Sequence, residues 1–250
     1  LKTDCCSCGS HDLDHKGFGT EQIQEEAQAL FPKASIGRMD FDTTRGKYDY
    51  ERIIQSFEKQ NIDILVGTQM LTKGLDFRNV KLVGVLNADQ LINFPDFRSH
   101  ERSFQLLQQV SGRAGRTDVR GIVLIQSFNP NHNILQQVST NDYQKMFEEQ
   151  AYQRHNYKYP PYCRLIKLTL KHRDFSLVNE GADWLKSALF QVFGDCVLGP
   201  EFPPIPRIRN LYHKNILIKI PSEQSLKKTK QILTKIKNSF VRTAVFRPVR

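Results

Sequence analysis

The sequence predicts an α/β domain built on a parallel sheet, followed by a smaller α+β domain. In roughly the first 140 residues, short apolar runs alternate with stretches of helical periodicity, as expected for parallel strands joined by helices. The helical pattern then ends at Tyr159-Pro160-Pro161-Tyr162, because proline disfavours a helical conformation in the residue before it. A second, shorter set of strand and helix patterns follows this break.

The first part is expected to contain three helices and four strands. The helices are expected over residues 21–30, 48–60 and 103–110, and the strands over residues 36–39, 62–66, 80–86 and 121–126. Thr20 is expected to cap the first helix, and Pro32 to stop it. Ligands of parallel sheets bind at the carboxyl ends of the strands, where Gly67-Thr68 and Ala88-Asp89 fall.

The second part is expected to begin with a linking helix over residues 141–154. Strands are then expected over 165–170, near Val197, over 215–220 and over 244–246; helices over 176–193 and 226–237; and a proline-rich stretch over 200–206. The domains predicted are a remnant of a cysteine-rich region (1–16), the α/β domain (17–140), the linking helix (141–158) and a basic α+β domain (159–250).

Charge is distributed unevenly between the two parts. Residues 1–150 hold 17 Lys and Arg against 20 Asp and Glu, whereas residues 151–250 hold 19 against 6. The whole basic excess therefore lies in the last hundred residues. Such a surface favours a phosphate-rich partner, with a merely solubilising basic surface as the alternative.

Composition excludes several classes of protein. A hydrophobic content of 39% supports packed cores, and 25% charged residues of mixed sign argue against disorder. No apolar run reaches the length of a bilayer-spanning helix, so no membrane association is expected and a cytoplasmic location is the default. The five cysteines are odd in number and irregularly spaced, which argues against a disulfide framework.

The strongest motif is Q-x-x-G-R-x-G-R, at the end of the helix expected over 103–110. Gln109 begins it, and Arg113 and Arg116 supply two guanidinium groups separated by small residues. Negative charge spreads over the γ-phosphoryl oxygens as a nucleoside triphosphate is hydrolysed, and guanidinium groups are suited to stabilise it. The alternative is a glycine-softened turn with two solvated arginines.

A second motif lies upstream, over residues 64–77. An apolar strand leads into Gly67, Thr68 and Gln69, and a glycine, Gly74, and an acid, Asp76, follow. The two blocks resemble motifs V and VI of superfamily 2 helicases, in the same order.

The resemblance narrows to one family, PriA, the primosomal protein N′ helicases of replication restart. The blocks that resemble it cover residues 17–22, 67–74, 93–102 and 109–116 in the first part, and 159–162, 197–200 and 209–219 in the second. The resemblance implies a RecA-like second helicase lobe followed by a small α+β C-terminal domain. It also implies an ATP-dependent 3′–5′ DNA helicase that recognises stalled or branched replication forks and initiates primosome assembly.

The resemblance also assigns roles within the first domain. It implies that Arg116 is an arginine finger with Arg113 as its companion on the phosphates, and that Gln109 couples nucleotide to DNA. Gly74 and Asp76 are expected near the nucleotide, with bracing of its own loop as the alternative for Asp76. Thr68, Gln69 and Lys73 are expected to face the DNA backbone or the cleft between the lobes. Thr20 is expected to offer its hydroxyl and helix N-terminus to a DNA phosphate, with simple capping as the alternative.

The cysteines at the start suggest zinc. Cys5 and Cys8 form a C-x-x-C half-site, and the resemblance implies that such pairs bind zinc in this family. Zinc takes four ligands, so one pair cannot complete a site; an exposed, oxidisable pair is the alternative.

In the basic domain, Arg207, Arg209, Tyr212 and Lys214 place cations around an aromatic ring, a pattern typical of nucleic-acid contact. The expected partners are branched and single-stranded DNA and, from the resemblance, single-stranded DNA-binding protein and primosome loader proteins.

The 250 residues contain no G-x-x-x-x-G-K-[ST] phosphate loop. ATP with Mg²⁺ is therefore expected to need a first lobe, and these residues alone are expected to be inactive. Two other hypotheses remain: a superfamily 2 motor of the RecG type, or a non-catalytic module that binds DNA or protein.

Overall fold

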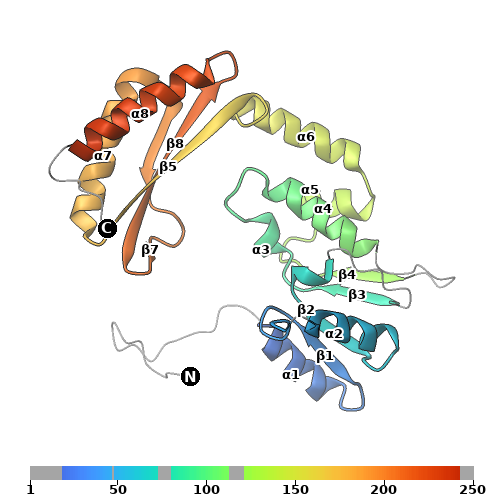
Figure 1. The fold of residues 1–250 in the computed structure, drawn as a ribbon. Helices are drawn as coiled ribbons and strands as arrows, with labels where there is room; N and C mark the ends of the chain where they lie inside the picture. The colour runs from blue at the N-terminus through green and yellow to red at the C-terminus, as the bar shows by residue number, and fades with distance from the viewer. Residues whose placement is uncertain (1–18, 47, 73–79, 113–120, 243–250) are drawn as a thin grey trace. The chain divides into compact units, whose positions relative to one another are not determined.

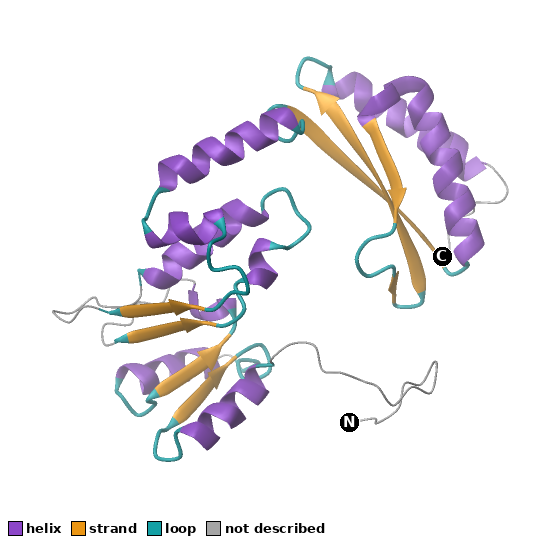
Figure 2. Ribbon diagram, turned by 180° about the vertical axis from the view of Figure 1, so that it is seen from behind, coloured by secondary structure: helices purple, strands orange, loops and turns teal. Residues whose placement is uncertain are grey.

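The computed structural model describes residues 19–46, 48–72, 80–112 and 121–242. Its contacts divide the chain into two compact units, Leu1–Tyr143 and Gln144–Arg250. Figure 1 shows the order of their elements, and Figure 2 shows the helices packed against the strands of each unit.

The strands of the first unit form two parallel pairs. Strand β1 (Ile36–Met39) pairs with β2 (Ile64–Gly67), and β3 (Leu82–Val85) pairs with β4 (Ile122–Ile125). This confirms the α/β class predicted from the alternating pattern.

Six helices accompany these strands among the described residues of the first unit. They are α1 (Thr20–Leu30), α2 (Asp49–Glu58), the 3-10 helix η1 (Gln69–Thr72), α3 (Asp89–Ile92), α4 (Ser99–Ser111) and α5 (Asn133–Ser139). The short helices η1, α3 and α5 were not predicted, and α4 begins four residues earlier than expected. The three missed helices are only four, four and seven residues long, too short for a helical period to be recognised in the sequence.

The core of the β1–β2 pair centres on Met39, which is fully buried. The predicted apolar face of α2 packs on it through Ile53, Ile54 and Phe57, together with Leu65 of β2. A 3.6-residue period brings these three α2 positions onto one side of the helix, which confirms that prediction.

A buried carboxylate, Asp40, organises the end of β1. Its Oδ2 accepts a hydrogen bond of 2.5 Å from the Thr20 hydroxyl and lies 3.2 Å from Arg38 Nε. Its Oδ1 accepts from the backbone N–H groups of Asp42 and Thr43 at 3.0 and 2.9 Å. Asp40 therefore joins α1, β1 and the turn after β1.

The second unit is an antiparallel sheet with two long helices (Figure 1). It comprises α6 (Tyr143–Asn156), β5 (Cys163–His172), α7 (Phe175–Phe193), η2 (Gly194–Cys196), β6 (Val197–Glu201), β7 (Arg207–Ile208), β8 (Leu211–Pro221) and α8 (Leu226–Arg242). The strand order is β5-β8-β6, and β7 pairs with the start of β8. The helix α6 begins in the first unit and continues into the second.

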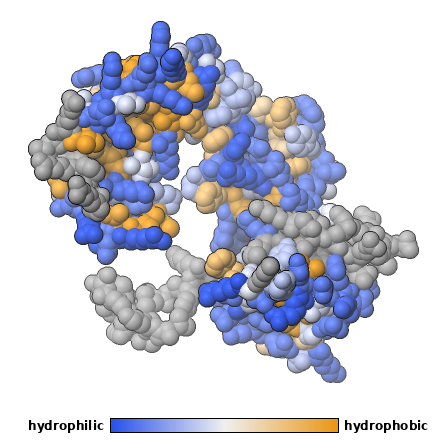
Figure 3. Space-filling model, in the orientation of Figure 1, coloured by the Kyte–Doolittle hydropathy of each residue, from blue (hydrophilic) through white to orange (hydrophobic). Residues whose placement is uncertain are grey.

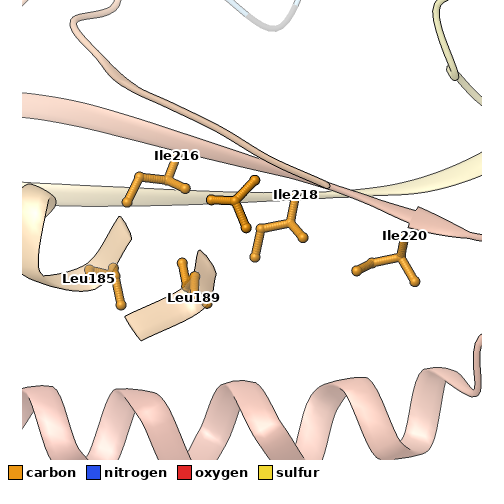
Figure 4. Close-up of a cluster of buried hydrophobic side chains, with 6 residues drawn as sticks. Leu185, Leu189, Ile216, Ile218 and Ile220 are labelled. Carbon is orange, nitrogen blue, oxygen red and sulfur yellow. The ribbon is translucent and has the colours of Figure 1, made fainter. Parts of the chain in front are cut away.

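Alternation along β8 builds the core of this unit. Ile216, Ile218 and Ile220 are fully buried, and they meet Leu185 and Leu189 of α7 (Figure 4). Successive side chains of a strand point to opposite faces, so these three isoleucines share the face that the helices cover. Helix α8 adds Leu233, Ile236 and Phe240 to the same core.

Two features of this unit differ from the sequence prediction. Strand β8 starts at Leu211 rather than at residue 215, because β7 folds back on it through a two-residue turn. Both turn residues, Arg209 and Asn210, have positive φ angles, 49° and 62°, as a hairpin of this kind requires. The strand expected over residues 244–246 lies outside the described residues.

Within the described part of the chain, none of the helices combines the length and apolar character needed to cross a bilayer.

We expect Ile218→Ala to lower the unfolding free energy of the second unit by about 2–5 kcal/mol, because it leaves a cavity in a closed core. The chain has one tryptophan, Trp184, which packs against this core, so its fluorescence during urea unfolding reports on this unit. Ile208→Ala, at a position 44% exposed, is the matched control and should cost far less. Equal effects of the two substitutions would contradict this account of the core.

We expect Asp40→Asn to destabilise the first unit at neutral pH by about 1–3 kcal/mol, because the amide nitrogen cannot accept from Thr20 or pair with Arg38. The hydrogen bond from Thr20 is the main reason that the pKa of Asp40 lies below its ordinary value. A lowered pKa in the folded state gives stability above about pH 4 that is lost as the pH falls through the folded value. The gap between wild type and variant should therefore close under acid conditions.

Hydrogen exchange of the α1 and β1 amides across that pH range measures this difference. Asp42→Asn is the control, since Asp42 is exposed and its carboxylate forms an ion pair with the exposed Arg45. A difference that persists unchanged at pH 3 would show that Asp40 acts through packing and not through its charge.

Candidate nucleotide and nucleic-acid interface

The end of β2 requires glycine. A Cβ at Gly67 would lie 2.5 Å from the carbonyl oxygen of Met39 on the neighbouring strand and 2.7 Å from the Leu71 side chain. The chain then turns directly into η1, and its Leu71 N–H donates to the Thr68 carbonyl at 3.1 Å. This turn leaves Thr68 and Gln69 exposed just beyond the carboxyl end of β2, the position that ligands of parallel sheets occupy.

Helix α4 carries the start of the Q-x-x-G-R-x-G-R motif. Gln109 is exposed in its last turn, while Phe104 and Leu107 are buried on the other side of the helix. The remaining candidates of the two helicase motifs lie outside the described residues, namely Lys73, Gly74, Asp76, Arg113 and Arg116. Their roles stay predictions.

The segment before α4 fixes where that helix begins. Asp96 accepts a hydrogen bond from the Arg98 backbone N–H at 2.8 Å and lies 3.3 Å from Arg102 Nη1 in the first turn. A carboxylate close to a helix start interacts favourably with the helix dipole. The residues 93–102 that resemble the family thus orient the helix that presents Gln109.

Asp89, expected near a ligand, ties together the ends of β3 and β4. Its carboxylate accepts from the Phe128 backbone N–H and from the Ser127 hydroxyl, each at 3.0 Å. The bond from Phe128 is the main reason that the pKa of Asp89 is lowered. Its observed contacts brace the loop after β4.

The capping role predicted for Thr20 is wrong. Gly19 is the N-cap of α1 and Thr20 is its first helical residue, and its hydroxyl donates to Asp40 instead of closing the helix. A hydroxyl has one proton, so Thr20 cannot donate to a phosphate while it donates to Asp40. Any phosphate contact at this point must therefore use other donors or break that bond.

In the second unit the structure brings three of the four predicted residues together. Arg207 and Tyr212 are cross-strand partners, and the Arg207 guanidinium carbon lies 5.1 Å from the centroid of the Tyr212 ring. The Lys214 ammonium donates to the Asn179 side-chain oxygen and lies 4.9 Å from the Phe202 ring centroid. Arg209 is exposed in the β7–β8 turn beside them.

The sequence interpretation missed two residues of this cluster. Phe175, the first residue of α7, and Phe202, just after β6, stack with ring centroids 5.6 Å apart and planes 7° from parallel. Tyr212 meets Phe175 edge-on at 5.4 Å. Phe175 and Phe202 lie 27 positions apart, so no local pattern signals the contact. Figure 3 shows hydrophobic and hydrophilic side chains mixed on the surface around the β7–β8 hairpin.

The predicted zinc half-site, Cys5 and Cys8, lies outside the described residues. Within residues 19–46, 48–72, 80–112 and 121–242, no group of three or more His, Cys, Asp or Glu side chains is placed to hold a metal ion. Of the two cysteines in that part, Cys163 is buried, which raises the pKa of its thiol, and Cys196 is partly buried.

Comparison with known proteins matches both units. Residues 17–118 match the helicase conserved C-terminal domain, and residues 155–250 match the primosomal protein N C-terminal domain. The replication restart protein PriA of Bacillus subtilis (strain 168) is 41% identical over 89% of this chain and 28% of its own length. Those of Synechocystis and Haemophilus influenzae are 40% and 38% identical, over 87% and 90% of this chain and 26% and 31% of their own lengths.

The chain thus spans less than a third of the length of these relatives. The two matched domains occur in the order in which the structure shows a parallel α/β unit and an antiparallel α+β unit. The chain therefore belongs to the PriA family, and it corresponds to the helicase C-terminal and primosomal C-terminal domains of that family.

Proposed function

We propose that this chain forms part of an ATP-dependent 3′–5′ DNA helicase that acts at stalled or branched replication forks and initiates primosome assembly. The first unit serves as the second motor lobe, and the second unit holds DNA. The observation that carries the proposal is the position of Gln109. It is exposed in the last turn of α4, shortly before the two arginines of the motif in the sequence. The exposed turn at Thr68 and Gln69 belongs to the same unit.

ATP hydrolysis in this proposal needs both lobes of the motor. Arg113 and Arg116 supply positive charge to the γ-phosphoryl oxygens, and Gly74 and Asp76 line the nucleotide. The phosphate loop and the Mg²⁺ ligand come from a first lobe, because the 250 residues contain no such loop. The chain alone therefore does not hydrolyse ATP.

DNA contact in this proposal comes from both units. In the motor lobe, the DNA backbone is contacted by Thr68, Gln69 and Lys73. The start of α1, at Thr20, also contacts it. The larger contribution comes from the second unit. There Arg207 and Lys214 lie over the rings of Tyr212 and Phe202, Arg209 is exposed in the β7–β8 turn, and cations outnumber acids 19 to 6 over residues 151–250. Neutralising phosphates releases condensed counterions, which drives binding.

Zinc and protein partners complete the proposal. Cys5 and Cys8 supply two thiolates, half of the four ligands that a structural zinc takes. Primosome loader proteins and single-stranded DNA-binding protein are the proposed partners. The support for these partners is that the relatives named above are replication restart proteins.

In a full-length protein, we expect Arg116→Ala to lower DNA-stimulated ATP turnover by about 10³-fold or more, as loss of an arginine finger does. DNA affinity should stay within about twofold of wild type, because the finger contacts nucleotide. Arg45→Ala, which removes an exposed arginine paired with Asp42, is the control and should retain activity. Normal turnover in Arg116→Ala would refute the finger assignment.

The chain should bind DNA with an affinity that falls steeply as salt increases. Fluorescence anisotropy with forked, single-stranded and duplex DNA over a series of salt concentrations gives the slope. Arg207→Gln and Arg209→Gln should each weaken binding to all sequences and reduce the slope by about one. Arg52→Gln, at an exposed arginine of α2, should leave the slope unchanged. Salt-independent binding, or none at low salt, would discard the proposed basic surface.

A further inference from the structure

Two stacked phenylalanines lie open to solvent on the second unit. Phe175 is 52% exposed and Phe202 is 38% exposed, and neither belongs to the core built around Ile216, Ile218 and Ile220. Exposed aromatic rings lose the hydrophobic stabilisation that burial would give them. A stacked, exposed pair beside cations is therefore a candidate binding surface.

The backbone around Phe175 is held in place before any ligand arrives. The Asp174 carboxylate accepts from the Leu177 backbone N–H at 3.0 Å and so caps α7. The Asp174 N–H in turn donates to the His172 ring at 2.9 Å. A ring fixed at a capped helix start gives up little conformational entropy when something stacks on it.

The ring of Tyr212 is partly buried and already has neighbours. Arg207 lies over it at 5.1 Å, and Phe175 meets it edge-on. Tyr212 was expected to contact nucleic acid, but these contacts make it a support that orients Phe175. The exposed area belongs to Phe175 and Phe202.

Positive charge surrounds the pair. Lys214 is held over the Phe202 ring by its hydrogen bond to Asn179, and Arg207 lies beyond Tyr212. Of the two acids closest in sequence, Asp174 is engaged in capping α7, and Glu201 precedes Phe202. Exposed aromatic rings with cations beside them, one of which lies over Phe202, match a strand whose bases are unpaired and whose phosphates are charged.

We propose that Phe175 and Phe202 form a stacking site for an unpaired base of single-stranded DNA, with Arg207 and Lys214 on the flanking phosphates. This inference rests on the proposed DNA-binding function and names the form of DNA that this site takes. Duplex DNA does not fit, because its bases are already stacked on one another. An acidic peptide with aromatic residues could use the same cations, and the experiment distinguishes it.

The test compares two single strands with equal numbers of phosphates, an oligothymidine and the same oligomer with abasic nucleotides at its centre. The 250-residue chain should bind the oligothymidine about 5- to 150-fold more tightly, the range that corresponds to 1–3 kcal/mol for one stacked base. Phe175→Leu and Phe202→Leu should remove most of this preference. Neither should change affinity for the abasic strand or the dependence on salt.

The matched variants separate stacking from folding. Phe175→Tyr keeps the ring and should keep the preference. Phe190→Leu, at a position 49% exposed on the same helix, should also leave it intact. If either leucine variant unfolds, photocrosslinking of the wild-type chain to an oligomer that contains 5-iodouracil still tests the stacking site. The crosslink should map to Phe175 or Phe202.

The outcomes are distinct. Salt-sensitive binding with equal affinity for both oligomers, or crosslinks only at other residues, would overturn the stacking site and leave the proposed DNA-binding function intact. No binding to any DNA at low salt would overturn both. A further outcome is that the leucine variants stop binding an acidic peptide that ends in phenylalanine and keep the preference for the oligothymidine. In that case the surface would be a peptide-binding site and the inference would be wrong.

Discussion

The second unit depends on strand β8, because one face of this strand both fills the hydrophobic core and contacts the aromatic cluster. Tyr212, Lys214, Ile216, Ile218 and Ile220 alternate with the other residues of the strand and so point to the same side of the sheet. The last three are buried under α7 and α8. The first two contact residues in the first two turns of α7, Phe175 and Asn179. The strand that closes the core thus also orients the aromatic cluster.

Carboxylates play the corresponding part in the first unit. Asp40 follows β1, Asp63 precedes β2 and Asp89 follows β3, and each accepts hydrogen bonds from backbone N–H groups of a connecting segment. Each has a lowered pKa for that reason, with the Thr20 hydroxyl as the largest cause at Asp40. These bonds are stronger when the carboxylates are ionised, so the stability they add is lost only as the pH falls through the lowered pKa values.

The parts that sequence could predict are those with a regular period. Ile53, Ile54 and Phe57 face the core as their helical spacing requires, and the strand limits Ile36–Met39 agree with the prediction. The β7–β8 hairpin was missed because its turn, Arg209 and Asn210, lacks the glycine that usually marks positive φ.

The candidate site was predictable only in part. The sequence alone predicted Arg207, Tyr212 and Lys214. These residues lie close together in the sequence, so a cluster of charges around an aromatic ring can be recognised there. Phe175 joins them through the end of α7 and Phe202 through the loop after β6, contacts that depend on tertiary packing. Thr20 was assigned to its own helix because its partner, Asp40, lies 20 positions away. Local pattern identifies residue types suited to a task, whereas long-range contacts decide which of them are free to perform it.

The uneven charge has a consequence for the proposed motor. A lobe that advances along DNA must release and rebind phosphates in each cycle, so strong attraction within that lobe would slow release. Residues 1–150 carry more acids than bases, and residues 151–250 carry the basic excess. In the proposed motor, placing most of the electrostatic attraction in the second unit would keep DNA bound while the proposed contacts at Thr68 and Gln69 break and reform. On this argument, transferring positive charge from the second unit to the edge of the motor lobe would raise affinity and lower the rate of translocation.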